Sequence, residues 1–281
     1  MSGGGPGDVG PPDRALADAF FARGWVAIPH DPVLALWVEA ARPVAARLLA
    51  DPDLRARWLR CGGTWFAGVN VFPNDAAGGV PGTGVPPLGG RAVGFIRDAL
   101  GLEGFAWDAA QLSVCLPGYP AAPSADEDAA AFRYRQTRDA AHLDGLARDG
   151  ARRRRVGEVH GFILGIPLAD TAPDAAPLVV WEGSHELMRR ALRARLGHLP
   201  PAAWAAEDIT DSYVAARRAA FDTCPRIAVH ARPGACYLLH RLALHGVAPW
   251  GAAGGAAPRP IVYFRPDPFP GADPSWWLDR R

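Results

Sequence analysis

The chain contains no lysine. Its 281 residues include 30 basic residues, all of them arginine, and 29 acidic ones. A pyridoxal phosphate enzyme needs a lysine for its Schiff base, and a P-loop needs one beside its glycines. Both classes are therefore excluded, and an anion must be held by arginine, hydroxyl groups or backbone amides. The formal net charge of +1 gives no overall field that favours nucleic acid or a membrane surface.

Cysteines and long apolar runs are also scarce. The four cysteines include no CxxC pair, which argues against a zinc knuckle. Cys115 and Cys236 lie in apolar runs, so we expect them in the core. No apolar run approaches the roughly 20 residues of a membrane span, and residues 1–11 lack the apolar core of a targeting signal. We therefore expect a reduced, cytoplasmic protein with a flexible tail at residues 1–11.

Hydrophobic periodicity divides the remaining chain into two parts. Helical patterns and one short strand, WVAIP, occupy about 12–104, whereas short strands follow one another over about 105–266. A helical insertion is expected at about 186–221. This pattern is mainly β with α, and it predicts a barrel or sandwich behind an N-terminal helical layer. Without a convincing linker, residues 12–281 are expected to form a single domain.

Two arginine-rich segments lie near the predicted site. Residues 117–140 are rich in alanine and proline and end just before His142, so they are either a lid or a solvated insertion. Residues 152–155 are four consecutive arginines between two predicted strands. Because the net charge is near zero, an exposed turn is a better interpretation of this run than a nucleic-acid site. Both segments could steer an anionic substrate.

A candidate metal site begins with His142 and Asp144 in the run AHLDG. On a strand, residues two apart point to the same face. The segment LLHRLALHG offers a third ligand, but His240 and His245 would face opposite sides of a continuous strand. His245 precedes Gly246, where the backbone can approach a ligand closely, whereas His240 suits a hydrogen-bonded core position. Two histidines and one carboxylate leave positions open, as non-haem Fe(II) requires.

The order HLDG, VVWEGSHE, LLHRLALHGVAPW and RPIVYFR resembles the phytanoyl-CoA dioxygenase family over about residues 105–266. This resemblance implies a double-stranded β-helix, a jelly-roll of the cupin-like kind. It implies an oxygenase that uses Fe(II), O₂ and 2-oxoglutarate to hydroxylate a small molecule, with release of succinate and CO₂. His142, Asp144 and His245 match the iron ligands. Halogenating relatives replace the carboxylate with a small residue, so Asp144 favours hydroxylation.

The resemblance also suggests residues that bind the cosubstrate. Arg259 matches the arginine that binds the distal carboxylate of 2-oxoglutarate, through a planar two-pronged guanidinium. Arg265 is the alternative, on the same strand face and expected farther from the metal end. His160 is either near the cosubstrate or a core histidine. Gln111 and Ser113 could face the same cavity.

Other positions carry weaker expectations. Ser184 and His185 form a turn that we interpret as architectural, with Ser184 capping a helix from about Glu186. Trp65 and Trp250 could line the pocket. Val247, Trp250 and the pair Ala176-Pro177 depart from the family pattern, which leaves the set of cosubstrate contacts open.

Two other functions fit the same residues. One is a cupin-like metal enzyme that does not use 2-oxoglutarate. The other is a non-catalytic binding protein that keeps an oxygenase fold. No motif specifies the substrate or the oligomeric state.

Overall fold

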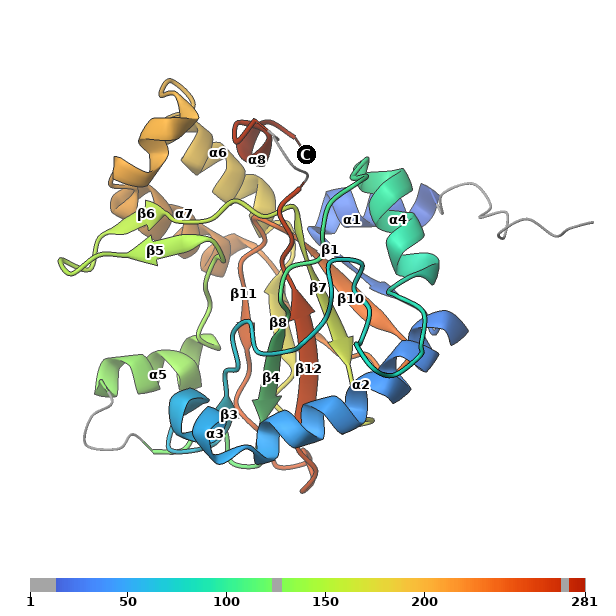
Figure 1. The fold of residues 1–281 in the computed structure, drawn as a ribbon. Helices are drawn as coiled ribbons and strands as arrows, with labels where there is room; N and C mark the ends of the chain where they lie inside the picture. The colour runs from blue at the N-terminus through green and yellow to red at the C-terminus, as the bar shows by residue number, and fades with distance from the viewer. Residues whose placement is uncertain (1–13, 123–127, 269–272, 281) are drawn as a thin grey trace, which may run out of the picture.

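The computed structural model describes residues 14–122, 128–268 and 273–280, and two facing sheets form its centre (Figure 1). The larger sheet has the strand order β1-β10-β7-β12-β4-β3-β2 and is antiparallel throughout. Its strands are β1 (Trp25–Ile28), β10 (Cys236–His240), β7 (Phe162–Pro167), β12 (Arg259–Phe264), β4 (Gln111–Cys115), β3 (Trp65–Phe66) and β2 (Leu59–Arg60).

The smaller sheet has the order β11-β8-β9, with β11 at His245–Val247, β8 at Leu178–Trp181 and β9 at Arg226–Val229. Its inner face packs against the inner face of the larger sheet. One buried cluster joins Leu178 and Val180 of the smaller sheet to Leu239 and Ile261 of the larger one. Because side chains alternate along a strand, the neighbouring residues of each strand face outward, toward the helices.

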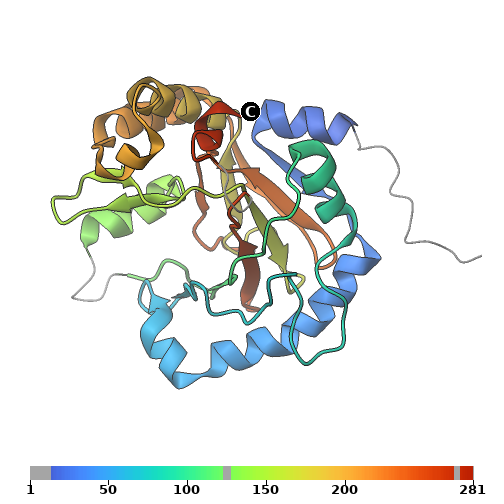
Figure 2. The same cartoon turned by 45° about the horizontal axis from the view of Figure 1, so that its top comes forward.

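Two helical layers cover the outer faces (Figure 2). The larger sheet packs against the N-terminal helices α1 (Arg14–Arg23), α2 (Pro32–Ala50) and α4 (Gly90–Leu100), with α3 (Pro52–Trp58) after α2. The smaller sheet packs against α6 (Ser184–Leu196), α7 (Thr210–Thr223) and the short C-terminal α8 (Trp276–Asp279). Both outer clusters are apolar, so burial holds the helices on the sheets.

Local sequence explains the helix boundaries. The Asp31 side chain accepts a hydrogen bond from the amide of Val33, and Pro32 occupies the first turn of α2, where its missing N–H costs nothing. Asp51 follows the last residue of α2 and caps α3, so the helical segment breaks at this point. The helical stretch expected at 186–221 is two helices, separated by a 3₁₀ turn at Pro201–Ala206.

The structure corrects two expectations about the architecture. The described helices hold more residues than the strands, so the fold is mixed α and β rather than mainly β. The N-terminal third is also more than a helical layer, because β1 forms one edge of the larger sheet and β2 with β3 forms the other. The predicted tail at residues 1–11 lies outside the described residues.

Both arginine-rich segments contain regular structure. Residues 129–138 form helix α5 (Ala129–Arg138) within the proposed lid, of which residues 123–127 lie outside the described part. The run of four arginines lies in the hairpin of β5 (Leu146–Arg148) and β6 (Arg154–Val156), where Arg152 and Arg153 are exposed. None of the four cysteines forms a disulfide, and Cys115 and Cys236 are buried as predicted. No described helix is long and apolar enough to cross a membrane.

Candidate metal centre

The segment that carries His142 begins with an unusual backbone turn. After α5 ends, Asp139 and Ala140 have φ angles of 54° and 52°, in the left-handed region that non-glycine residues rarely adopt. The buried Asp139 carboxylate accepts two hydrogen bonds from Arg226 of β9, both 2.7 Å long. This two-pronged pair holds the strained turn and directs the chain toward β11.

Backbone pairing then joins the two distant parts of the site. The amide of His142 donates to the carbonyl of His245 over 2.8 Å, and the amide of His245 donates back over 3.1 Å. Gly246 allows this close approach, because a Cβ there would lie 2.1 Å from the carbonyl oxygen of Asp139. The predicted strand is therefore reduced to a single bridge at His142, followed by a turn at Asp144.

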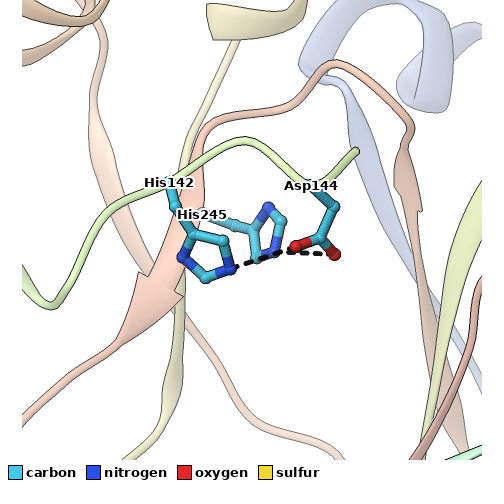
Figure 3. Close-up of side chains that lie close together, drawn as sticks. All are labelled: His142, Asp144 and His245. Carbon is cyan, nitrogen blue, oxygen red and sulfur yellow. Dashed lines mark ion pairs between the residues drawn. The ribbon is translucent and has the colours of Figure 1, made fainter. Parts of the chain in front are cut away.

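Three side chains converge at this bridge. Figure 3 shows His142 and Asp144 from one loop and His245 from β11 pointing to the same spot. Nε2 of His142 lies 3.2 Å from Oδ1 of Asp144, and Nε2 of His245 lies 3.6 Å from Oδ2. The three ligand atoms all lie within 4.8 Å of one another. Such spacing suits one divalent ion held by two nitrogens and one oxygen.

Hydrogen bonds to the main chain fix both imidazoles in the same tautomer. Nδ1 of His142 lies 2.9 Å from the carbonyl of Ala140, and Nδ1 of His245 lies 2.9 Å from the carbonyl of Ala243. A carbonyl can only accept, so in each neutral ring Nδ1 carries the proton and Nε2 has a free lone pair. The donor set and its hydrogen-bonded support therefore fit a metal ion.

Arg265 contacts the acidic member of this cluster. Its Nε donates to Oδ2 of Asp144 over 2.5 Å, and its amide donates to the carboxylate of Asp108. Burial would raise the pKa of Asp144, but the charge of Arg265 and the nearby imidazoles outweigh it and hold that pKa well below its usual value. Our expectation that Arg265 lies farther from the metal end is therefore wrong, because the end of β12 passes beside Asp144.

Arg259 lies at the opposite end of β12. Its side chain is only 6% exposed, and its Nη1 has no hydrogen-bond partner among the described residues. Nearby, the Tyr237 hydroxyl donates to the Tyr263 hydroxyl over 2.8 Å. An unpartnered nitrogen on a buried guanidinium is costly, so the Nη1 position fits a carboxylate that comes from a ligand.

A cavity of about 950 Å³ opens over the cluster and is lined by all three candidate ligands. Gln111 and Ser113 of β4 line it, as predicted, and so does Trp65. The Gln111 amide nitrogen donates to the carbonyl of Ala67, and Trp65 Nε1 donates to the Ser113 hydroxyl over 3.0 Å. These bonds fix the polar wall of the cavity. Trp250 does not line it.

Several predicted residues lie elsewhere. His160 precedes β7, is 3% exposed and does not line the cavity; burial lowers its pKa to about 4. His240 is a buried histidine that accepts a hydrogen bond from Leu242, as predicted. Ser184 is not a helix cap: it begins α6, and its hydroxyl accepts from the amide of Leu244, beside His245. The turn thus stabilises the chain that leads to the third candidate ligand.

The sequence interpretation missed two features of the site. One is the pairing of Arg265 with Asp144. The other is a set of acidic side chains around the cavity, which come from separate loops and helix ends: Asp108, Glu158, Asp267 and Asp273. No local pattern marks these residues.

Comparison with known proteins is informative only at the level of the fold. No protein-family model matches the chain, and no curated protein matches it. Among solved structures, it is similar to SnoK, a non-haem α-ketoglutarate-dependent carbocyclase from nogalamycin biosynthesis, with a TM-score of 0.51 and 15% identity over 95% of this chain and 91% of SnoK. It is also similar to AviO1 from Streptomyces viridochromogenes Tue57, with a TM-score of 0.51 and 17% identity over 92% of this chain and 96% of AviO1. The chain therefore has the fold of such enzymes.

Proposed function

We propose that this protein is an Fe(II)- and 2-oxoglutarate-dependent oxygenase of small molecules, built on a double-stranded β-helix. The observation that carries the proposal is the convergence of His142, Asp144 and His245, with both histidine Nε2 atoms free and facing the carboxylate. This arrangement occupies one face of a metal ion and leaves the other positions for a cosubstrate and O₂. The fold shared with SnoK supports the same conclusion.

The second half of the proposal concerns 2-oxoglutarate. Its distal carboxylate would bind Arg259, whose buried Nη1 lacks a partner, and the Tyr237–Tyr263 hydroxyl pair lies beside that guanidinium. Its keto acid end would then extend toward the metal. Bound together, Fe(II) and 2-oxoglutarate would supply the electrons that activate O₂, and 2-oxoglutarate would be oxidised to succinate and CO₂.

The remaining residues bind and orient. His142 and His245 keep fixed rings because each donates from Nδ1 to a nearby main-chain carbonyl, and Arg265 fixes the Asp144 carboxylate. The bridge between His142 and His245 sets their separation. The inner faces of the two sheets, with Leu178 and Leu239 at the cavity wall, exclude water from the reacting groups.

We favour hydroxylation as the outcome because Asp144 retains the carboxylate that halogenating relatives lack. The fold does not decide this point, because SnoK is a carbocyclase. The substrate must fit the cavity of about 950 Å³, which is the size of a small-molecule site rather than a macromolecular groove.

An anaerobic titration tests the proposal. Fe(II)-loaded protein is titrated with 2-oxoglutarate while the metal-to-ligand charge-transfer band is recorded. We expect a band in the native protein, because a keto acid that chelates Fe(II) produces one. In Arg259→Ala the band should appear only at higher 2-oxoglutarate concentration. His198→Ala, which changes an exposed histidine, serves as a control and should titrate like the native protein.

The possible results separate the functions considered. Iron bound without any band would indicate a metal enzyme that does not use 2-oxoglutarate. No iron binding at all would contradict the metal site itself.

A further inference from the structure

The charged side chains that line the cavity are mostly acidic. Five acidic residues line it, against one basic residue, Arg265, and three of the five, Glu158, Asp267 and Asp273, are exposed. The acidic residues are Asp108, Asp144, Glu158, Asp267 and Asp273. The whole chain is nearly balanced, with 30 basic and 29 acidic residues, so this excess is a local property of the cavity.

Metal binding does not neutralise this charge. Asp144 is paired with Arg265, and a divalent ion would bind the same carboxylate. The other four carboxylates have no ion-pair partner among the described residues. Bound 2-oxoglutarate would add two negative charges, of which Arg259 offsets one. The cavity would therefore remain acidic when the cofactor and cosubstrate are in place.

A separate observation points to a ligand that donates hydrogen bonds. Gln111 is 8% exposed and lines the cavity, with its Nε2 fixed on the carbonyl of Ala67. This leaves Oε1, a pure acceptor, without a donor among the described residues. Asp108 is half-buried nearby, and burial raises its pKa to about 6, so its charged form gains stability from a cation.

Aromatic rings complete the lining. Trp65, Trp107 and Trp276 line the same cavity as the carboxylates. A tryptophan face attracts an organic cation, and this attraction is stronger where water is partly excluded. Carboxylates, a free amide oxygen and indole rings together form a surface suited to a positively charged nitrogen.

The nearby arginines do not change this picture. Arg152 pairs with Asp128, and Arg153 and Arg155 pair with Asp149. Arg138 lies over the ring of Phe221 instead. None of these arginines lines the cavity, which argues against the anionic substrate that the sequence suggested.

We propose that the substrate of this oxygenase carries a protonated amine, which binds between the Asp108, Glu158 and Asp267 carboxylates and the cavity tryptophans. This inference rests on the proposed function for the identity of the cavity as a substrate site. The amine anchors the substrate at these carboxylates, so that a C–H bond elsewhere in the substrate faces the metal. The expected class is therefore a small aliphatic or alicyclic amine, free of carboxylate or phosphate groups.

Two probes of equal shape test the charge preference. Phenethylamine and phenethyl alcohol differ only in the charged group, and their affinities for the purified full-length chain can be measured by ligand-observed NMR. We expect the amine to bind roughly tenfold more tightly at about 20 mM salt and less so at about 200 mM, because salt screens partly exposed charges. Equal affinities, or no binding of the amine, would overturn the proposal.

Variants test which side chains cause the preference for the amine. Glu158→Gln combined with Asp267→Asn should weaken phenethylamine several-fold and leave phenethyl alcohol unchanged, whereas Asp222→Asn, at an exposed position on α7, should change neither. If the double variant misfolds, quenching of tryptophan fluorescence in the native protein gives the same information. A cationic quencher should then act more strongly than iodide. The opposite order would contradict the proposal.

This test is independent of the charge-transfer titration. Amine preference without a charge-transfer band would leave the acidic site intact and remove the oxygenase function. A band without amine preference would do the reverse.

Discussion

Arg259 begins β12 and Arg265 directly follows its last residue, six positions on, yet their surroundings differ completely. Arg265 donates to Asp144 with its side chain and to Asp108 with its amide. Arg259 is buried, and its Nη1 has no partner among the described residues. One guanidinium supports the protein's own carboxylate, and the other is available for a carboxylate from outside.

The difference shows that the polar groups of the interior fall into two sets, one at the metal end and one at the far end, near Arg259. At the metal end, both imidazole Nδ1 atoms and the Asp144 carboxylate already have protein partners, so the geometry exists before any ligand arrives. At the far end, a buried charge remains partly unsatisfied, which proteins tolerate mainly where a ligand restores the missing bonds. The predictions below test this division.

The largest effect is expected from His245→Ala. Changing groups outside the ligand shell already costs roughly 10- to 100-fold in metal affinity, so loss of a ligand should cost more than about 100-fold. Calorimetric titration with Fe(II) under anaerobic conditions measures this loss. His198→Ala should bind iron like the native protein, and native-like binding by His245→Ala would contradict the account.

Arg259→Ala should weaken cosubstrate binding at the far end without affecting the metal end. We expect 2-oxoglutarate to bind roughly 10- to 100-fold more weakly, because a hydrogen bond to a charged group contributes about 1.5–3 kcal/mol. Fe(II) affinity should be unchanged. Arg259→Lys keeps the charge but loses the two-pronged geometry, so its affinity should lie between those of the native protein and the alanine variant. Unaltered 2-oxoglutarate binding in Arg259→Ala would identify another anchor.

Arg265→Ala should affect the metal end instead. We expect about a tenfold loss of Fe(II) affinity, at the lower end of the range for residues that orient a ligand. Arg232→Ala is a suitable control, because Arg232 forms an exposed ion pair with Asp170, away from the cavity. Tighter iron binding in Arg265→Ala would show that the guanidinium competes with the metal.

The smallest effect concerns acid stability without metal. The folded-state pKa of Asp144 is depressed, so its ionised form contributes stability above the unfolded pKa of about 3.9, and this contribution is lost as pH falls through the folded value. Arg265→Ala should therefore lower the free energy of unfolding most above about pH 4, and the difference from the native protein should shrink in acid. Chemical denaturation across this pH range gives the comparison, and a difference independent of pH would argue against the pairing.

Local patterns were enough to bring the candidate ligands together. His142 and Asp144 stand two apart, and their side chains converge with that of His245. Gly246 was expected to let the backbone approach a ligand, whereas in the structure it admits the backbone of Asp139. Such patterns could not predict the role of Arg265. Which end of β12 lies near the metal depends on how the strand crosses the 142–145 turn. The acidic residues of the cavity are harder still to predict from the sequence, since Asp108, Glu158 and Asp267 are each an ordinary polar residue in their own segment.

The same limit applies to the fold. The central strands of the larger sheet, β4, β7, β10 and β12, were readable as short apolar segments, whereas β2 and β3 were not predicted. The edge role of β1 depends on pairing with β10, more than 200 positions later. Helix α5 was not predicted, because it contains no buried residue and its sequence carries no apolar stripe.

The most direct test of the central claim is a crystal structure of the Fe(II)-loaded protein, grown anaerobically, with anomalous data collected at the iron edge. We predict one iron peak within bonding distance of His142 Nε2, a carboxylate oxygen of Asp144 and His245 Nε2. An iron peak at another position, or one bound to the 142–144 pair with His245 turned away, would contradict the claim.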